Sequence, residues 1–171
     1  MINKKVETAL LNQVALEAYA SMSYLAMASW MDCAGYEGTA QFLYAQSEEE
    51  RGHMLKIFHY INDAGGTAIV PELKKPKATY SSYAACFDEI LKQEIKVSNA
   101  IHSLVDLSVN EKDHTTNNFL QWYVSEQLEE ESQFRTIIDK IKMLGKDGSG
   151  LYLLDKDLGG MAAAVTVLPA E

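Results

Sequence analysis

Acidic and amide side chains interrupt the apolar stripes of four segments of this chain, at positions that a helix would bury. In each segment apolar residues recur at the three- and four-residue spacing of an amphipathic helix. An ionised carboxylate inside a protein costs several kcal/mol unless a positive charge meets it, and no Lys or Arg lies on these stripes. A bound pair of metal ions is the simplest compensation. The interrupting residues are Glu17, Glu50 with His53, Glu94, and Gln127 with Glu130.

Two of these interruptions are pairs whose members are three residues apart. Because residues at that spacing share one face of a helix, Glu50 and His53 are expected to point at one spot, as are Gln127 and Glu130. Carboxylate bundles that bind two metal ions use one Glu from each of two helices and a Glu-x-x-His pair from each of the other two. The fourth segment departs from that pattern, because it carries Gln-x-x-Glu.

This set of ligands favours iron or manganese. It is rich in oxygen, with one imidazole and no thiolate, which suits Fe(II) or Mn(II) better than a structural zinc. Glu50 is placed to bridge two ions about 3.5–4 Å apart, and two adjacent Fe(II) ions can reduce O2 by two electrons. The second ion lacks an imidazole. We therefore expect it to be held more weakly and to behave as a substrate in transit, not as a permanent cofactor.

Four long helices and one short helix account for most of the chain. Gly65-Gly66 and Gly145 are typical stops after a helix. Residues 67–80 contain two prolines and lack a helical period, and an extended stretch of that length can run along a neighbouring helix. The helices that flank it can then lie parallel, which predicts an all-α four-helix bundle with one long crossover and a short fifth helix. We expect helices at 5–33, 38–64, 82–110, 115–144 and 149–158, in a single domain 1–171 whose bundle covers about 5–145 and whose tail, 159–171, has no clear period.

The composition argues against some classes of function. The 171 residues carry a net charge of −9, whereas a nucleic-acid-binding protein needs a basic surface. An acidic surface instead attracts small cations. No uncharged stretch is long enough to span a bilayer. The two cysteines, Cys33 and Cys86, belong to no Cys-x-x-Cys pair, so we expect reduced thiols and a cytoplasmic protein.

Four motifs contain the candidate residues. They are Leu16-Glu17-Ala18-Tyr19 with Tyr24, the run Glu48-Glu49-Glu50-Arg51-Gly52-His53, Glu94, and Ser125-Glu126-Gln127-Leu128-Glu129-Glu130. With these motifs the chain resembles the bacterial non-haem ferritins, from residue 1 to about 158. The resemblance implies a ferritin-like fold and a ferroxidase that oxidises Fe(II) with O2 or H2O2. It also implies storage of the product as a ferric oxyhydroxide mineral inside a homo-oligomeric cage of twenty-four subunits.

The resemblance further implies a role for each candidate residue. The first iron would be held by Glu17, Glu50 and His53. The second iron would be held by Glu50, Glu94 and Glu130, with Gln127 near by. A third iron site would be formed by Glu49, Glu126, Glu129 and Glu130. Beside the dinuclear centre, the matching aromatic residues are Tyr24 and Trp122.

Two positions differ from related families. Bacterioferritins carry a haem-ligating Met directly after the Glu of Glu-x-x-His, and this chain has Arg51 there, so we expect no haem. Animal ferritins line a three-fold channel with carboxylates near the start of the fourth helix, where this chain has Asn117 and Leu120. The route by which iron enters is therefore left open.

Plainer interpretations exist for the individual residues. Glu17 alone could be hydrogen-bonded across the bundle, and Glu50 with His53 could be a buried acid–imidazole pair. Tyr24 and Trp122 could be packing residues. The acids of the third site stand in acidic runs, which usually form a solvated face. The metal interpretation is preferred because it explains all four helices together.

The sequence therefore predicts an iron-storage ferroxidase whose substrates are iron and O2 or H2O2. The alternative is a di-iron oxidase or peroxidase that acts on a non-iron substrate, for which a second Glu-x-x-His would be expected. A purely structural cage subunit should have lost Glu50 or His53. A DNA-protecting mini-ferritin is disfavoured by the fifth helix and by the site inside the bundle. Neither nucleic acid nor a membrane is expected as a partner.

Overall fold

The computed structural model describes residues 2–145 and 148–165, and its described elements are all helices. The four long helices begin and end within two residues of the expected positions, which confirms the predicted all-α bundle. They are α1 (Lys4–Cys33), α2 (Glu37–Asp63), α3 (Tyr83–Asn110) and α4 (His114–Leu144), followed by α5 (Gly148–Val165).

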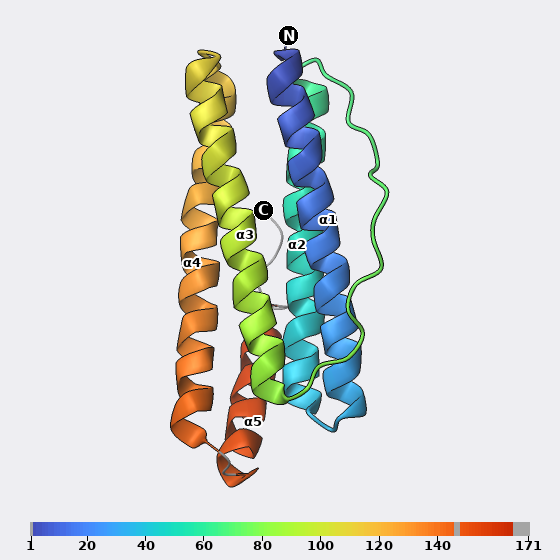
Figure 1. Ribbon diagram of the computed structural model, residues 1–171, viewed down its shortest axis with the longest axis vertical. Helices are drawn as coiled ribbons and strands as arrows, with labels where there is room; N and C mark the ends of the chain where they lie inside the picture. The colour runs from blue at the N-terminus through green and yellow to red at the C-terminus, as the bar shows by residue number, and fades with distance from the viewer. Residues whose placement is uncertain (1, 146–147, 166–171) are drawn as a thin grey trace.

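The long connection between α2 and α3 sets the topology. It runs beside α1 from one end of the bundle to the other, so that α2 and α3 point in the same direction (Figure 1). The helices α1 and α2 form one closely packed antiparallel pair, and α3 and α4 form the other. The predicted parallel arrangement across a crossover is therefore confirmed.

Side-chain caps explain where three of the helices begin. Asn3 accepts a hydrogen bond from the backbone N–H of Lys5, and Ser82 accepts one from Ala85 at 3.0 Å. Asp113 accepts a bond from the N–H of Thr116 at 2.9 Å. Each cap satisfies a donor that the first turn of a helix leaves unpaired.

The apolar core forms two clusters that are separated along every long helix by polar residues. In α1, for example, Glu17 follows Val14 of one cluster and precedes Tyr24 of the other. The same order holds for Glu50 in α2, for Glu94 in α3, and for Gln127 with Glu130 in α4. The flanking residues in α2, α3 and α4 are Leu43 and Ile57, Ile90 and Val97, and Tyr123 and Phe134. The candidate residues thus share one layer between two apolar halves.

The fifth helix is longer than expected. It continues to Val165, so the predicted end at 158 and the tail beginning at 159 are wrong; residues 166–171 of that tail lie outside the described part. Glycine disfavours a helix interior, and α5 contains two adjacent glycines, Gly159 and Gly160. At Gly159, however, an added Cβ would lie 3.0 Å from the Cα of Gly38, so the glycine permits close packing of α5 on α2. The buried stripe also continues at a spacing of four, through Leu154, Leu158 and Ala162.

An aspartate of α5 caps α2. The first residue before α2, Tyr36, makes no side-chain cap. Instead Asp155 accepts hydrogen bonds from the N–H of Gly38 at 3.1 Å and from the N–H of Thr39 at 2.8 Å. It also accepts one from the Thr39 hydroxyl at 2.7 Å. The carboxylate lies at the positive end of the helix dipole, so docking of α5 stabilises the start of α2.

Both cysteines are free, with Cys33 exposed and Cys86 buried. Among the described residues, no helix combines the length and the apolar character needed to cross a membrane.

Replacement of Asp155 by Ala should lower the free energy of unfolding by about 1–2 kcal/mol, the usual range for loss of a helix cap. The measurement is denaturant unfolding followed by circular dichroism at fixed protein concentration. Asp157→Ala is the matched control, because Asp157 is exposed on the same helix and carries the same charge. Equal effects of the two substitutions would show that the cap does not stabilise α2.

Candidate metal centre

The structure brings the predicted dinuclear residues together in the middle of the bundle. They are contributed by all four long helices and are almost completely buried, between 0% and 5% exposed: Glu17, Glu50, His53, Glu94, Gln127 and Glu130. Among the described residues, no Lys or Arg is buried. In the described part of the chain, therefore, no buried basic side chain meets these carboxylates, in keeping with the apolar stripes.

Three of these residues form a compact group of potential metal ligands. Glu17, Glu50 and His53 each offer one ligand atom, and these atoms lie within 4.8 Å of one another. The Nδ1 atom of His53 is 3.4 Å from Oε2 of Glu50. Both of these atoms, and Oε2 of Glu17, are buried without any hydrogen-bond partner. Buried polar atoms rarely stay unpaired in folded proteins, and two carboxylate oxygens with one imidazole nitrogen are a donor set that a divalent cation satisfies.

The opposite side of the centre, on α3 and α4, is more fully hydrogen-bonded. The Tyr24 hydroxyl donates to Oε1 of Glu94 at 2.5 Å. The Gln127 amide nitrogen lies 3.3 Å from both Oε2 and the backbone oxygen of Glu94, and 3.3 Å from the Ser98 hydroxyl. Oε2 of Glu130 is buried and unpartnered. In this structure, therefore, Tyr24 and Gln127 orient Glu94, and Glu130 offers the open oxygen.

Burial dominates the electrostatics of the centre. It raises the pKa of Glu17, Glu50 and Glu94 above the usual range, and for Glu17 and Glu50 the negative charge of a neighbouring carboxylate adds to the effect. Burial, followed by the charge of Glu94, raises the pKa of Glu130 to about 9. Burial also raises the pKa of Tyr24. Without a cation the centre favours protonated acids, and a bound cation would favour the ionised ligands.

A second group of potential ligands adjoins the first. Glu49, His53 and Glu126 each offer an atom within 4.8 Å of the others, and Nε2 of His53 is 3.9 Å from Oε1 of Glu126. Burial raises the pKa of Glu49. A neighbouring cavity of about 330 Å³ is lined by all four predicted third-site acids and by Met161 and Ala162 of α5; the acids are Glu49, Glu126, Glu129 and Glu130.

Trp122 lies beside His53, as the resemblance implied. The two rings meet edge to face with their centroids 5.3 Å apart. The ammonium of Lys56 stands 3.3 Å from the centroid of the Trp122 ring, in a cation–π contact. Trp122 thus lies between a surface cation and the buried imidazole.

Several supporting residues were not predicted from the sequence. Gln13 donates to Oε1 of Glu17 at 2.8 Å, and Gln46 donates to Oε2 of Glu49 at 2.5 Å. Both precede their partner by one helical turn, so spacing could have found them. The Tyr123 hydroxyl donates to the backbone oxygen of His53 at 2.7 Å, and Ser98 contacts Gln127. These two contacts join different helices and left no local signal.

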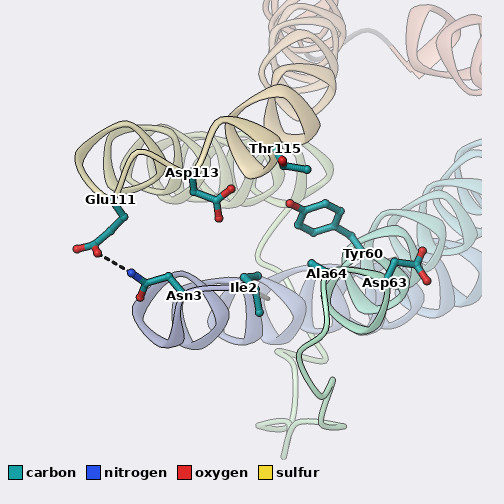
Figure 2. Close-up of a pocket in the computed structure, with 8 residues that line it drawn as sticks. All are labelled: Ile2, Asn3, Tyr60, Asp63, Ala64, Glu111, Asp113 and Thr115. Carbon is teal, nitrogen blue, oxygen red and sulfur yellow. Dashed lines mark hydrogen bonds between the residues drawn. The ribbon is translucent and has the colours of Figure 1, made fainter.

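Another cavity, of about 440 Å³, lies where α1 and α4 begin and α2 and α3 end (Figure 2). Two of its acids, Glu111 and Asp113, already have partners. Glu111 accepts hydrogen bonds from Asn3 at 2.6 Å and from Lys5 at 2.7 Å, and Asp113 caps α4. These two acids stabilise the end of the bundle, and the predicted metal ligands are elsewhere.

Comparisons with known proteins agree with this geometry. The family model for the ferritin-like domain matches residues 7–144. Bacterial non-heme ferritins from Staphylococcus epidermidis and Escherichia coli are 42% and 40% identical to this chain over 158 residues, which are 92% of the chain and 95% and 96% of those proteins. The open pore ferritin of the archaeon Archaeoglobus fulgidus superposes with a TM-score of 0.92 at 36% identity, covering 93% of this chain and 98% of that one. The chain belongs to the ferritin family.

Replacement of Glu130 by Gln should stabilise the metal-free protein, and more so at pH 8 than at pH 5. The folded pKa of about 9 lies above the unfolded value near 4.5, so the carboxyl favours the fold at low pH and costs stability as the pH rises toward 9. We expect a gain of about 1–3 kcal/mol at pH 8, measured by denaturant unfolding with chelator present. The control is Glu48→Gln, which removes the same charge at an exposed position of α2 and should change neither value. A gain that is equal at both pH values would contradict the electrostatic cause.

Proposed function

We propose that this ferritin is an iron-storage ferroxidase. It oxidises Fe(II) with O2 or H2O2 at the dinuclear centre and stores ferric oxyhydroxide inside a multisubunit cage. The observation that carries the proposal is the set of buried, unpartnered atoms on Glu17, Glu50 and His53, opposite Glu94 and Glu130, with no buried Lys or Arg among the described residues. The relatives named as non-heme ferritins support the same substrate.

Iron is the substrate of this centre. Glu17, Glu50 and His53 hold the first Fe(II), and Glu50, Glu94 and Glu130 hold the second. Two Fe(II) ions give one electron each to O2, which takes up two protons and becomes H2O2. As the two Fe(III) products hydrolyse, the water that they bind releases protons to the solvent. Tyr24 and Gln127 keep Glu94 oriented while the charge of the pair changes.

The two positions differ in strength. The first offers an imidazole nitrogen and two carboxylate oxygens with no other partner. The second offers carboxylates alone, and Glu94 is already hydrogen-bonded to Tyr24 and Gln127. The second ion is therefore held more weakly, and iron passes through the centre. From the centre, iron moves to the adjacent acidic cavity, which is lined by Glu49, Glu126, Glu129 and Glu130.

The same cavity favours iron over an organic substrate, which is the alternative function. Four carboxylates gather there next to the centre, and their negative charge attracts a cation. The prediction that no haem is bound still depends on Arg51. A cytoplasmic location is proposed because the chain belongs to the ferritin family.

We also propose a homo-oligomeric cage of twenty-four subunits. Large apolar side chains remain exposed on the single chain, which is typical of surfaces that are covered by assembly. Val70 in the crossover is 80% exposed, and Tyr152 and Leu153 on α5 are 70% and 61% exposed. The last two lie on α5 away from its buried stripe, so they can contact other subunits while α5 stays docked on α2.

Replacement of Glu50 or His53 by Gln should slow the fast oxidation of Fe(II) by more than about tenfold, because either change removes a ligand of the first iron. Stopped-flow absorbance of ferric products measures the rate, and circular dichroism checks the helices. Glu48→Gln is the matched control, since Glu48 is exposed and lies two residues from Glu50. Unchanged rates in the Glu50 and His53 variants would refute the site.

Deletion of residues 149–171 should weaken assembly more than subunit folding. A double substitution, Tyr152→Glu with Leu153→Glu, separates the two effects because it leaves the Asp155 cap in place. We expect a shift from the cage to small species in size-exclusion chromatography with light scattering, with little loss of helical signal. A full-sized cage from the double variant would show that this face of α5 is not an interface.

A further inference from the structure

His53 is the one described residue that belongs to both groups of ligand atoms. It stands with Glu17 and Glu50 in the first group and with Glu49 and Glu126 in the second. The other members are divided between the groups. Gln13 holds Glu17 on the first side, and Gln46 holds Glu49 on the second. Any coupling between the two groups through a shared ligand must therefore pass through the imidazole.

The two ring nitrogens of His53 face different groups. Nδ1 is 3.4 Å from Oε2 of Glu50, and Nε2 is 3.9 Å from Oε1 of Glu126. The ring is buried, and the edges of Trp122 and Tyr123 pack against it with centroids 5.3 and 6.2 Å away. The Tyr123 hydroxyl also fixes the backbone oxygen of His53. The packing keeps each nitrogen directed at its own group.

A neutral imidazole can serve one cation at a time. One nitrogen carries the proton and the other has the free electron pair that binds a metal. With a cation on Nδ1, the proton is on Nε2 and points toward Glu126, which becomes its acceptor. With a cation on Nε2, the proton is on Nδ1 and points toward Glu50. In each arrangement the other group loses the imidazole as a ligand, and one of its carboxylates accepts a hydrogen bond from the ring.

We propose that His53 is a tautomeric switch that makes the two groups compete for divalent cations. A cation in the group of Glu49 and Glu126 withdraws the imidazole from the group of Glu17 and Glu50. The inference rests on the proposed function for the identity of the ion, and it adds a means of hand-over: iron that arrives at the second group loosens the hold on the first. The binding affinities of the two groups are then linked, and by thermodynamic necessity the linkage is reciprocal.

The test is a site-resolved metal titration that needs no iron oxidation. Crystals of the full-length protein are soaked in a series of Zn(II) concentrations, and the anomalous signal of zinc gives the occupancy of each group. Glu17→Gln weakens the first group and Glu49→Gln weakens the second, each with little change of shape. Glu48→Gln is the control, because Glu48 is exposed and offers no atom to either group.

One of the two groups fills second in the unsubstituted protein. We expect half-saturation of that group to need about tenfold more Zn(II) in the unsubstituted protein than in the variant whose other group is weakened. Glu48→Gln should leave that difference unchanged. Equal half-saturation in all proteins, or zinc in the second group without contact to Nε2, would overturn the switch. A lack of zinc between Glu17, Glu50 and His53 in every protein would instead overturn the dinuclear centre itself.

Discussion

Burial of carboxylates without a basic partner is the constraint around which this bundle is built. Two apolar clusters enclose a layer to which every long helix adds an acid or an amide. In such a layer the charged forms are poorly solvated, and burial accordingly raises the pKa of Glu17, Glu50, Glu94 and Glu130. Burial of the two apolar clusters offsets this cost, so the folded chain can keep the site. Its carboxyl groups hold protons when no cation is present and bind cations when cations are available.

Hydrogen bonds divide the layer into unequal halves. On α1 and α2, one oxygen of Glu17 is held by Gln13 and the other is open, as are Oε2 of Glu50 and Nδ1 of His53. On α3, both oxygens of Glu94 already accept hydrogen bonds. The lack of a second imidazole in the sequence and the prior engagement of Glu94 in the structure thus favour the same outcome, one firm and one labile position.

Local signals in the sequence were sufficient for the bundle and for most of the centre. Buried stripes predicted the four long helices, and the four acids, one amide and one histidine inside those stripes predicted the six residues of the layer. The end of α5 was missed because the tail shows no clear period, whereas the close contact of Gly159 with Gly38 lets the helix continue against α2. The Asp155 cap joins residues more than a hundred positions apart, and the bond of Tyr123 to His53 joins α4 to α2. No spacing rule reports contacts of that kind.

The docking of α5 makes the two ends of the described chain unequal as attachment points. Ile2 lies at the end of the bundle where α2 finishes, against the cavity of Figure 2. Ala162, three residues before the helix ends, lines the acidic cavity beside the metal centre. A peptide or dye joined before α1 would therefore lie far from the ligands. One joined directly after α5 would begin close to the acidic cavity and experience the negative potential of its carboxylates.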